Sequence, residues 1–126
     1  MRVLLDTSAF IWSATSPERL SKAAMKVLSS EETLREISPL SLSEIAIKHD
    51  KGKLKFPKED VYAAISELKA RVLAYTASHA NRLFDLPQHH TDPFDRMIIA
   101  QALAEDIPIV TSDSQFRKYR DLKVIW

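Results

Sequence analysis

The sequence predicts an α/β fold, in which helices cover both faces of a central, mostly parallel sheet of roughly five strands (three-layer α/β/α). Short apolar runs typical of buried strands alternate along the chain with longer segments of helical periodicity. Parallel strands need such crossover segments, and the resulting sheet is covered on both faces. The five candidate strands are residues 3–5, 33–37, 72–75, 109–110 and 124–125.

Length and composition are those of an ordinary soluble domain. We expect residues 1–126 to form a single domain, because this length suffices for one hydrophobic core. The net charge of +1 neither indicates nor excludes a nucleic-acid partner. The chain has no cysteine, which rules out disulfides and thiolate metal sites and fits a reducing compartment. Without a signal-peptide pattern or a long apolar run, we expect a cytoplasmic protein with no membrane contact.

The helices are predicted from apolar spacing and from residues that favour helix ends. Ser41 is the expected N-cap of one helix, and Gly52, the only glycine, is expected to end it. Helices are predicted over residues 9–12, 20–28, 41–49, 59–69, 78–84 and 115–119.

The segment Asp92-Pro93-Phe94-Asp95-Arg96 predicts the start of one further helix. Asp92 suits the N-cap position, and Pro93 suits the first helical position, where its missing N–H has no cost. Seven of the eight residues from 97 to 104 are apolar, so this helix should be buried rather than amphipathic. Because Asp92 already accounts for the cap, Asp95 is free to face whatever lies at the mouth of the helix.

Four carboxylates fall where predicted strands end or predicted helices begin. In a parallel sheet these places lie beyond the carboxyl ends of the strands, where such folds bind ligands, so we expect the four to converge. Taken singly, each also fits a helix cap or a partner of the helix dipole. Glu44 fits a capping box with Ser41 and an ion pair with Lys48. The four are Asp6, Glu44, Asp95 and Asp113.

Convergence of these acids requires compensation of their charge. Two carboxylates about 5 Å apart repel each other by about 3 kcal/mol at an effective dielectric near 20, against a domain stability of about 5–15 kcal/mol. Either some acids are protonated or a divalent cation lies among them, and all-oxygen ligands favour Mg²⁺ or Mn²⁺. Such a site accepts phosphate oxygens, which points to phosphodiester hydrolysis. The glycine-rich motifs that cradle nucleotide phosphates are absent.

Four segments together resemble a known family. They are Leu4-Leu5-Asp6-Thr7-Ser8-Ala9-Phe10, Ser41 to Lys48, His90 to Arg96 with Ile99-Ala100-Gln101-Ala102, and Thr111-Ser112-Asp113. In this order and spacing they are similar to PIN-domain proteins, specifically to the VapC-type toxins of type II toxin–antitoxin systems. The resemblance implies a PIN-like fold, Mg²⁺-dependent endoribonuclease activity on RNA, a homodimer and inhibition by a cognate antitoxin. It also implies that Asp6, Glu44, Asp95 and Asp113 are catalytic, with Asp6 and Asp95 as direct metal ligands.

Other polar residues lie near these acids in the sequence. The hydroxyls of Thr7 and Ser112 fit two roles, since they are placed either to orient a carboxylate or a water molecule, or to form a turn or cap contact. Arg96 fits a contact with a phosphate or an offset of the acidic charge. His89 and His90 fit a contact with the site or a surface loop, and we expect the surface loop. The lysines within residues 48–58 are either a solvated surface or a contact for RNA backbone.

Two other functions fit some of these features. A receiver-like phosphoacceptor module also clusters acids around Mg²⁺ at a sheet edge, but it needs paired acids after its first strand and a lysine after its last but one. This chain has Thr7-Ser8 after Asp6, and Asp113-Ser114 in place of the lysine. A PIN-like scaffold that binds an antitoxin or RNA without catalysis is the other alternative, and the four acids argue against it.

Overall fold

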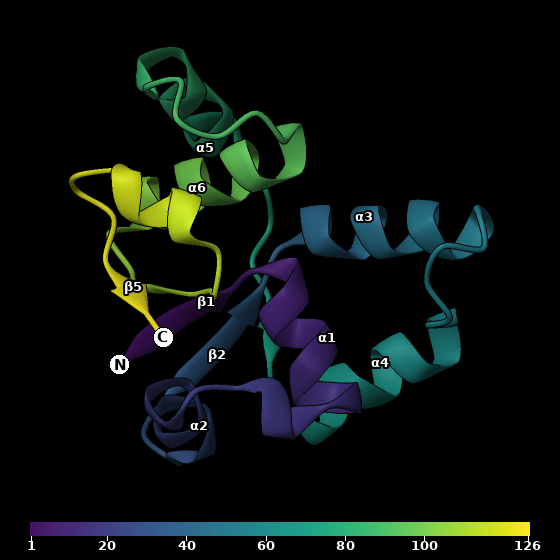
Figure 1. Ribbon diagram of the computed structural model, residues 1–126. Coiled ribbons are helices and arrows are strands. Elements are labelled where there is room, and N and C mark those ends of the chain that lie inside the picture. Colours follow the sequence, from purple (N-terminus) through teal and green to yellow (C-terminus); the bar gives the residue numbers. More distant parts are fainter.

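A computed structural model describes residues 1–126 as a five-stranded, all-parallel sheet between layers of helices (Figure 1). The strand order is β3-β2-β1-β4-β5. The strands are β1 (Arg2–Leu5), β2 (Leu34–Ile37), β3 (Arg71–Val72), β4 (Ile109–Val110) and β5 (Val124–Ile125). The helices are α1 (Thr7–Thr15), α2 (Lys22–Ser29), α3 (Pro39–Asp50), α4 (Lys58–Glu67), α5 (Ala77–Arg82) and α6 (Pro93–Glu105), with 3-10 turns η1 (Pro17–Arg19), η2 (Leu83–Asp85) and η3 (Ser114–Lys118).

The predicted three-layer α/β/α fold is confirmed, and its strand order excludes the receiver alternative. Receiver domains have the flavodoxin-like order 2-1-3-4-5, in which the third strand pairs with the first. Here β1 pairs with β2 and β4, and β3 lies at the edge beyond β2. The carboxyl end of the central strand β1 is therefore flanked by those of β2 and β4.

The sheet is buried on both faces, as the apolar run at the start of the chain predicted. Val3 and Leu5 belong to the core beneath α1, α2 and α4, whereas Leu4 belongs to the core against α6. All three side chains are fully buried. In Figure 1, α5 and α6 lie on one side of the sheet and α1, α2 and α4 on the other. None of the helices has the length and apolar character that crossing a bilayer requires.

Helix α6 begins as predicted. The Asp92 side chain accepts a hydrogen bond from the Asp95 N–H at 3.2 Å, and Pro93 is the first helical residue. Residues 98–102 are buried, so the helix is locked into the core.

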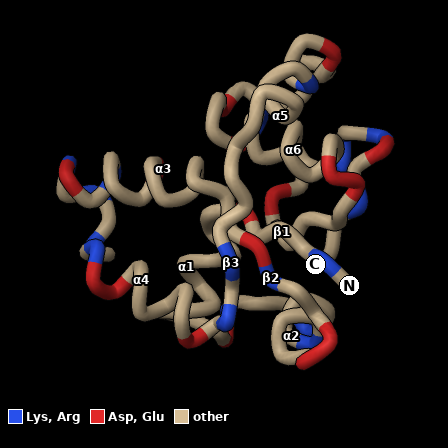
Figure 2. The backbone as a smooth tube through the Cα atoms, turned by 180° about the vertical axis from the view of Figure 1, so that it is seen from behind, with Lys and Arg blue, Asp and Glu red and all other residues tan.

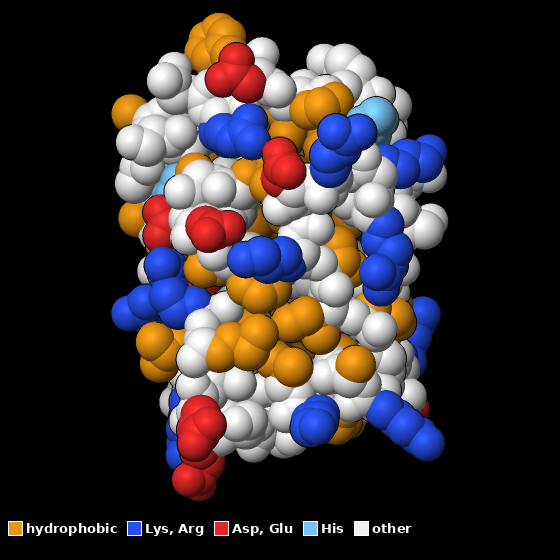
Figure 3. All heavy atoms as spheres, turned by 90° about the vertical axis from the view of Figure 1, so that its left-hand side faces the viewer, with side chains coloured by type: hydrophobic (Ala, Val, Ile, Leu, Met, Phe, Trp, Pro, Cys, Tyr) orange, Lys and Arg blue, Asp and Glu red, His pale blue; other side chains and the backbone are white.

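The face of the molecule at the left of Figure 1 carries an apolar patch bordered by Lys and Arg side chains (Figure 3).

The predicted start of α3 at Ser41 is wrong. The N-cap is Ser38, whose side chain accepts from the Leu40 N–H, and Pro39 occupies the first helical position. Ser41 is fully buried inside the helix, so the capping box with Glu44 does not form. Ser38 and Pro39 start the helix in preference to Ser41, because the Ser38 side chain satisfies a free backbone N–H and Pro39 fixes the first helical φ angle. Gly52 follows the helix end with φ of +71°, a conformation that favours glycine, as predicted.

Other boundaries shift by a few residues. The strand predicted over residues 72–75 contains two residues, and the helix predicted over residues 115–119 is the 3-10 turn η3. The helix predicted from residue 20 begins at Lys22, because Ser21 caps it. None of these shifts moves a predicted acid away from a strand end or a helix start.

Candidate metal-binding active site

Asp6 is a buried acid at the carboxyl end of β1. As N-cap of α1, its Oδ1 accepts the Ala9 N–H at 2.8 Å, and its Oδ2 accepts the Thr111 hydroxyl at 2.5 Å. The residue is only 4% exposed. Burial raises the pKa of Asp6 to about 6 against the opposing effect of these two hydrogen bonds, and the charges of Asp113 and Glu44 raise it further.

Asp95 is the second strongly perturbed acid, in the first turn of α6. Burial, followed by the charge of Asp92, raises the pKa of Asp95 to about 7. Glu44 and Asp6 also raise this pKa, whereas His90 lowers it. The charges of Glu44 and Asp6 therefore act on Asp95, so the three carboxylates form one electrostatic cluster although they come from separate elements.

Glu44 presents an unpaired oxygen. It lies on α3 and is 8% exposed. The Lys48 ammonium donates to its Oε2 at 2.8 Å, which confirms the predicted ion pair. Its Oε1 is buried and has no hydrogen-bond partner. A buried carboxylate oxygen without a partner is costly, and a cation at this position would remove that cost.

Asp113 is tied to the cluster through His90. Its Oδ1 accepts the Gln115 N–H at 2.9 Å and caps η3, and its Oδ2 lies 2.8 Å from His90 Nε2. The same nitrogen lies 3.2 Å from Asp95 Oδ2. The expectation of a surface position is wrong for His90, because its side chain is only 11% exposed. The signal available in the sequence was its place two residues before the cap Asp92, whose N–H donates to His90 Nδ1.

The residues present fit a hard divalent cation. The four acids supply carboxylate oxygens, one of them buried and unpaired, and two acids, Asp6 and Asp95, have pKa values raised by burial and by neighbouring carboxylates. One ligand-capable atom from each of His90, Asp95 and Asp113 lies within 4.8 Å of the others. A cation would offset the repulsion that these carboxylates experience.

The hydroxyls of Thr7 and Ser112 form no hydrogen bond with the four acids. Thr7 is buried and donates to the Ser41 hydroxyl at 2.9 Å, so it joins α1 to α3 rather than holding a carboxylate. Ser112 is exposed. The hydroxyl that holds Asp6 belongs instead to Thr111, the residue before Ser112, and the sequence did not predict this contact.

Arg96 forms no ion pair with the acids, and its guanidinium instead binds groups of the preceding loop and of Tyr119. Its guanidinium donates to the Pro87 carbonyl oxygen at 2.9 Å and to the Tyr119 hydroxyl at 3.4 Å. Tyr119 in turn accepts the backbone N–H of His90 at 2.9 Å. Arg96 therefore fixes the loop that carries His90 and supports the site indirectly.

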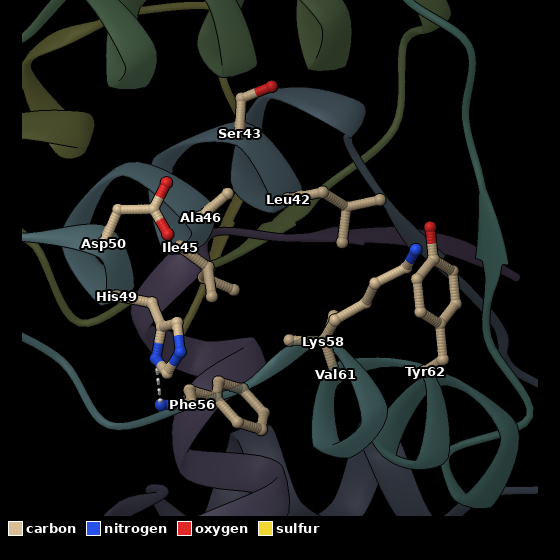
Figure 4. Close-up of a pocket in the computed structure, with 10 residues that line it drawn as sticks. All are labelled: Leu42, Ser43, Ile45, Ala46, His49, Asp50, Phe56, Lys58, Val61 and Tyr62. Atoms are coloured by element: carbon tan, nitrogen blue, oxygen red, sulfur yellow. Dashed lines mark hydrogen bonds between the residues drawn. The ribbon is translucent and has the colours of Figure 1, made fainter.

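An apolar groove lies apart from the acids, between α3 and α4 (Figure 4). It has a volume of about 350 Å³. Glu44 does not line it, so α3 presents the acid on one side and the groove on another. The side chains that line the groove include Leu42, Ala46, His49, Phe56, Val61 and Tyr62.

Comparison with known proteins identifies the family. Residues 3–122 match the PIN domain. The chain is 30% identical over 121 residues to Ribonuclease VapC22 of Mycobacterium tuberculosis, covering 94% of this chain and 92% of that protein. Among solved structures, it is similar to VapBC2 from Rickettsia felis bound to a promoter DNA fragment, with a TM-score of 0.75 and 17% identity, covering 98% of this chain and 97% of that one. It is also similar to VapC20 of M. tuberculosis, a sarcin-ricin loop cleaving toxin, with a TM-score of 0.64 and 14% identity over 95% of this chain and 98% of that one. The chain therefore belongs to the PIN-domain family, among its VapC-type members.

Proposed function

We propose that this protein is a metal-dependent endoribonuclease. The observation that carries the proposal is the convergence of four acids: Asp6 after β1, Asp113 after β4, Asp95 in the first turn of α6 and Glu44 in the second turn of α3. Two relatives support the substrate class, since one is named a ribonuclease and another is described as cleaving the sarcin-ricin loop. A scaffold without activity would have no use for four mutually repelling acids.

Asp6 and Asp95 would hold the Mg²⁺ or Mn²⁺ ion, with Glu44 and Asp113 beside them. Such an ion, when bound, lowers the pKa of a water molecule and neutralises charge on the scissile phosphate. If water attacks the phosphorus and the bond from phosphorus to the 3′ oxygen breaks, the products would be a 5′-phosphate and a 3′-hydroxyl.

The protein's own groups prepare the acids for this role. The Ala9 N–H and the Thr111 hydroxyl hold both oxygens of Asp6, and the buried helix α6 holds the backbone of Asp95. Glu44 Oε1, buried and unpaired, is placed to accept a proton from the attacking water. Lys48, half exposed beside Glu44, is placed to contact an RNA phosphate.

Asp6→Asn and Asp95→Asn test this proposal. Each keeps the size of the side chain and removes its charge, so RNA cleavage in Mg²⁺ should be lost while the circular-dichroism spectrum and the cooperative melting transition are retained. Asp121→Asn, which removes an exposed acid outside the cluster, is the matched control and should cleave at the wild-type rate. If both cluster variants cleave RNA as fast as the wild type, the chain does not use these acids for catalysis.

The similar VapBC structures, one of them described as a member of a family of toxin–antitoxin systems, further support a role as the toxin of such a pair. We also propose that the chain acts as a homodimer and that a cognate antitoxin inhibits it. Induced synthesis of the wild-type chain should then arrest growth of the host cell, and the Asp6→Asn variant should not. Light scattering of the purified chain should give twice its mass of 14.3 kDa. Unimpaired growth with folded, soluble wild-type chain present would contradict the toxin assignment.

A further inference from the structure

We propose that His90 is a positioning residue of the acidic site, which donates its Nε2–H to the carboxylate of Asp113, keeps the carboxylate of Asp95 beside the same nitrogen, and does not itself bind the metal. The proposal rests on the proposed metal site and assigns a role to a side chain outside the four acids. It starts from the position of one ring nitrogen, which lies 2.8 Å from Asp113 Oδ2 and 3.2 Å from Asp95 Oδ2.

The other ring nitrogen determines where the proton lies. His90 Nδ1 accepts the backbone N–H of Asp92 at 3.1 Å, so Nδ1 carries a lone pair and the proton is assigned to Nε2. A metal ligand at Nε2 would need its lone pair there. The ring proton would then move to Nδ1, directly against the Asp92 N–H, and two donors would face each other. The cap residue Asp92 therefore favours His90 as a donor to carboxylates over His90 as a ligand.

The ring is held firmly in this orientation. It packs edge-on against the buried Phe116, with ring centroids 5.6 Å apart and an interplanar angle of 89°. The backbone N–H of His90 donates to the Tyr119 hydroxyl at 2.9 Å. Because both its ring and its backbone are held, the His90 side chain is suited to keep other groups in place.

Asp113 and Asp95 meet at the same ring nitrogen. Asp113 is held at both oxygens, because its Oδ1 accepts the Gln115 N–H and its Oδ2 faces His90 Nε2. Asp95 Oδ2 lies 3.2 Å from His90 Nε2, and no Lys or Arg forms an ion pair with Asp95. The His90 ring therefore keeps the two carboxylates next to one N–H group.

Two readings of His90 predict different metal selectivity. Loss of a group that positions a metal-binding carboxylate weakens binding by about 10–100-fold, and it does so for any cation that the carboxylates hold. Loss of an imidazole ligand would weaken Mn²⁺ binding more than Mg²⁺ binding, because both ions favour oxygen ligands but Mn²⁺, a first-row transition metal, accepts a nitrogen ligand more readily than Mg²⁺ does.

The experiment measures Mg²⁺ and Mn²⁺ binding to the full chain by calorimetry, for the wild type, His90→Phe, His90→Gln and the control His89→Phe. Phenylalanine keeps a ring against Phe116 and removes both nitrogens, whereas glutamine restores an N–H donor. We expect His90→Phe to weaken both metals by about the same factor of 10–100, His90→Gln to recover most of the loss, and His89→Phe to bind as the wild type does. Melting in EDTA should show that all variants are folded.

Several outcomes would overturn the proposal. These are unchanged metal binding by His90→Phe, a loss restricted to Mn²⁺, failure of His90→Gln to restore binding, and absence of metal binding by the wild type. Nitrogen-15 NMR of the His90 ring is an independent test, because the proton should stay on Nε2 when Mg²⁺ is added. The proposed nuclease activity fails separately: if the wild type binds metal but cleaves no RNA, the binding data still decide the role of His90.

Discussion

Thr111 donates its hydroxyl hydrogen to Oδ2 of Asp6 at 2.5 Å, and this bond joins the ends of β4 and β1 across 105 positions of sequence. Both residues are buried. Burial disfavours the charged form of Asp6, and the Thr111 hydroxyl is the largest effect that favours it. Thr111 therefore keeps a buried carboxylate ready to bind a cation.

Thr111→Val should weaken the site without changing its shape. Valine has nearly the size of threonine but donates nothing, so the pKa of Asp6 should rise above its value of about 6. We expect Mg²⁺ binding to weaken by about 10–100-fold and the rise of cleavage rate with pH to move to higher pH. Thr111→Ser, which keeps the hydroxyl, is the control. Wild-type Mg²⁺ affinity in Thr111→Val would show that the bond is not needed.

The raised pKa values predict how metal-free stability depends on pH. Folded Asp6 has a pKa of about 6, above its ordinary value of 3.8, so the folded state binds more protons than the unfolded state between these pH values. Its stabilising effect is full below pH 3.8 and is lost as the pH rises through 6. Asp95, with a pKa of about 7, acts in the same direction.

Asp6→Asn isolates this effect, because asparagine stays neutral at every pH. In EDTA, urea unfolding should give similar stability for wild type and variant near pH 4, and the variant should become more stable by about 3 kcal/mol near neutral pH, from a shift of about two pKa units. Mg²⁺ should stabilise only the wild type to any large extent. A difference between the two proteins that stays constant with pH would contradict the raised pKa of Asp6.

Local signals in the sequence predicted the parts of the site that depend on neighbouring residues. The cap at Asp92, the proline after it and the apolar run of α6 lie within one segment, and all were found where expected. Ser41 was assigned a local role that Ser38 and Pro39 fill better. Because Ser41 is not the cap, its hydroxyl is available to accept the hydrogen bond from Thr7 on α1.

The contacts that sequence reasoning missed are long-range. Thr111 reaches Asp6 because β4 pairs with β1, and His90 reaches Asp113 because η3 folds back beside α6. Arg96 was expected at the acids because it is next to Asp95 in sequence, yet successive helical residues point in different directions, and it holds the loop at Pro87 instead. Side-chain direction and strand pairing, rather than residue type, decided these cases.

An ion network centred on the buried Glu36 joins three adjacent strands of the sheet. Glu36 on β2 is 1% exposed and accepts hydrogen bonds from Arg2 on β1 and Arg71 on β3. Figure 2 shows acidic and basic positions on these neighbouring strands. Arg2 also donates to Glu105 at the end of α6 at 2.9 Å. The pKa of Glu105 is lowered by hydrogen bonds first from His79 and then from Arg2.

Arg2→Met should lower the free energy of unfolding by about 2–3 kcal/mol, because it leaves the buried Glu36 with a single partner. Urea unfolding at neutral pH measures the loss. The matched control is Lys123→Met, since Lys123 pairs with Asp106 at 3.6 Å and both side chains are largely exposed. That change should stay within about 0.5 kcal/mol. Equal effects of the two substitutions would show that burial of Glu36 does not matter.

Lys48→Met should change metal binding and RNA binding in opposite directions. The Lys48 ammonium lies 2.8 Å from Glu44 Oε2, and its pKa is raised first by that hydrogen bond and further by the charges of Glu44, Asp92 and Asp95. Lys48 thus offsets part of the negative charge that attracts a cation. Its removal should tighten Mg²⁺ binding by up to about fivefold, which corresponds to the roughly 0.2–1 kcal/mol measured for ion pairs near the surface.

The same substitution should raise KM for RNA, because a half-exposed ammonium beside the acids is lost as a phosphate contact. Calorimetry with Mg²⁺ and cleavage rates over a range of RNA concentrations separate the two effects. Lys51→Met, at the exposed end of α3, is the control for a general loss of positive charge and should leave Mg²⁺ binding unchanged. Weaker Mg²⁺ binding by Lys48→Met would instead mean that Lys48 chiefly holds Glu44 in place. The two roles of the Lys48 ammonium have opposite effects on Mg²⁺ affinity, because support of Glu44 strengthens binding and a competing positive charge weakens it.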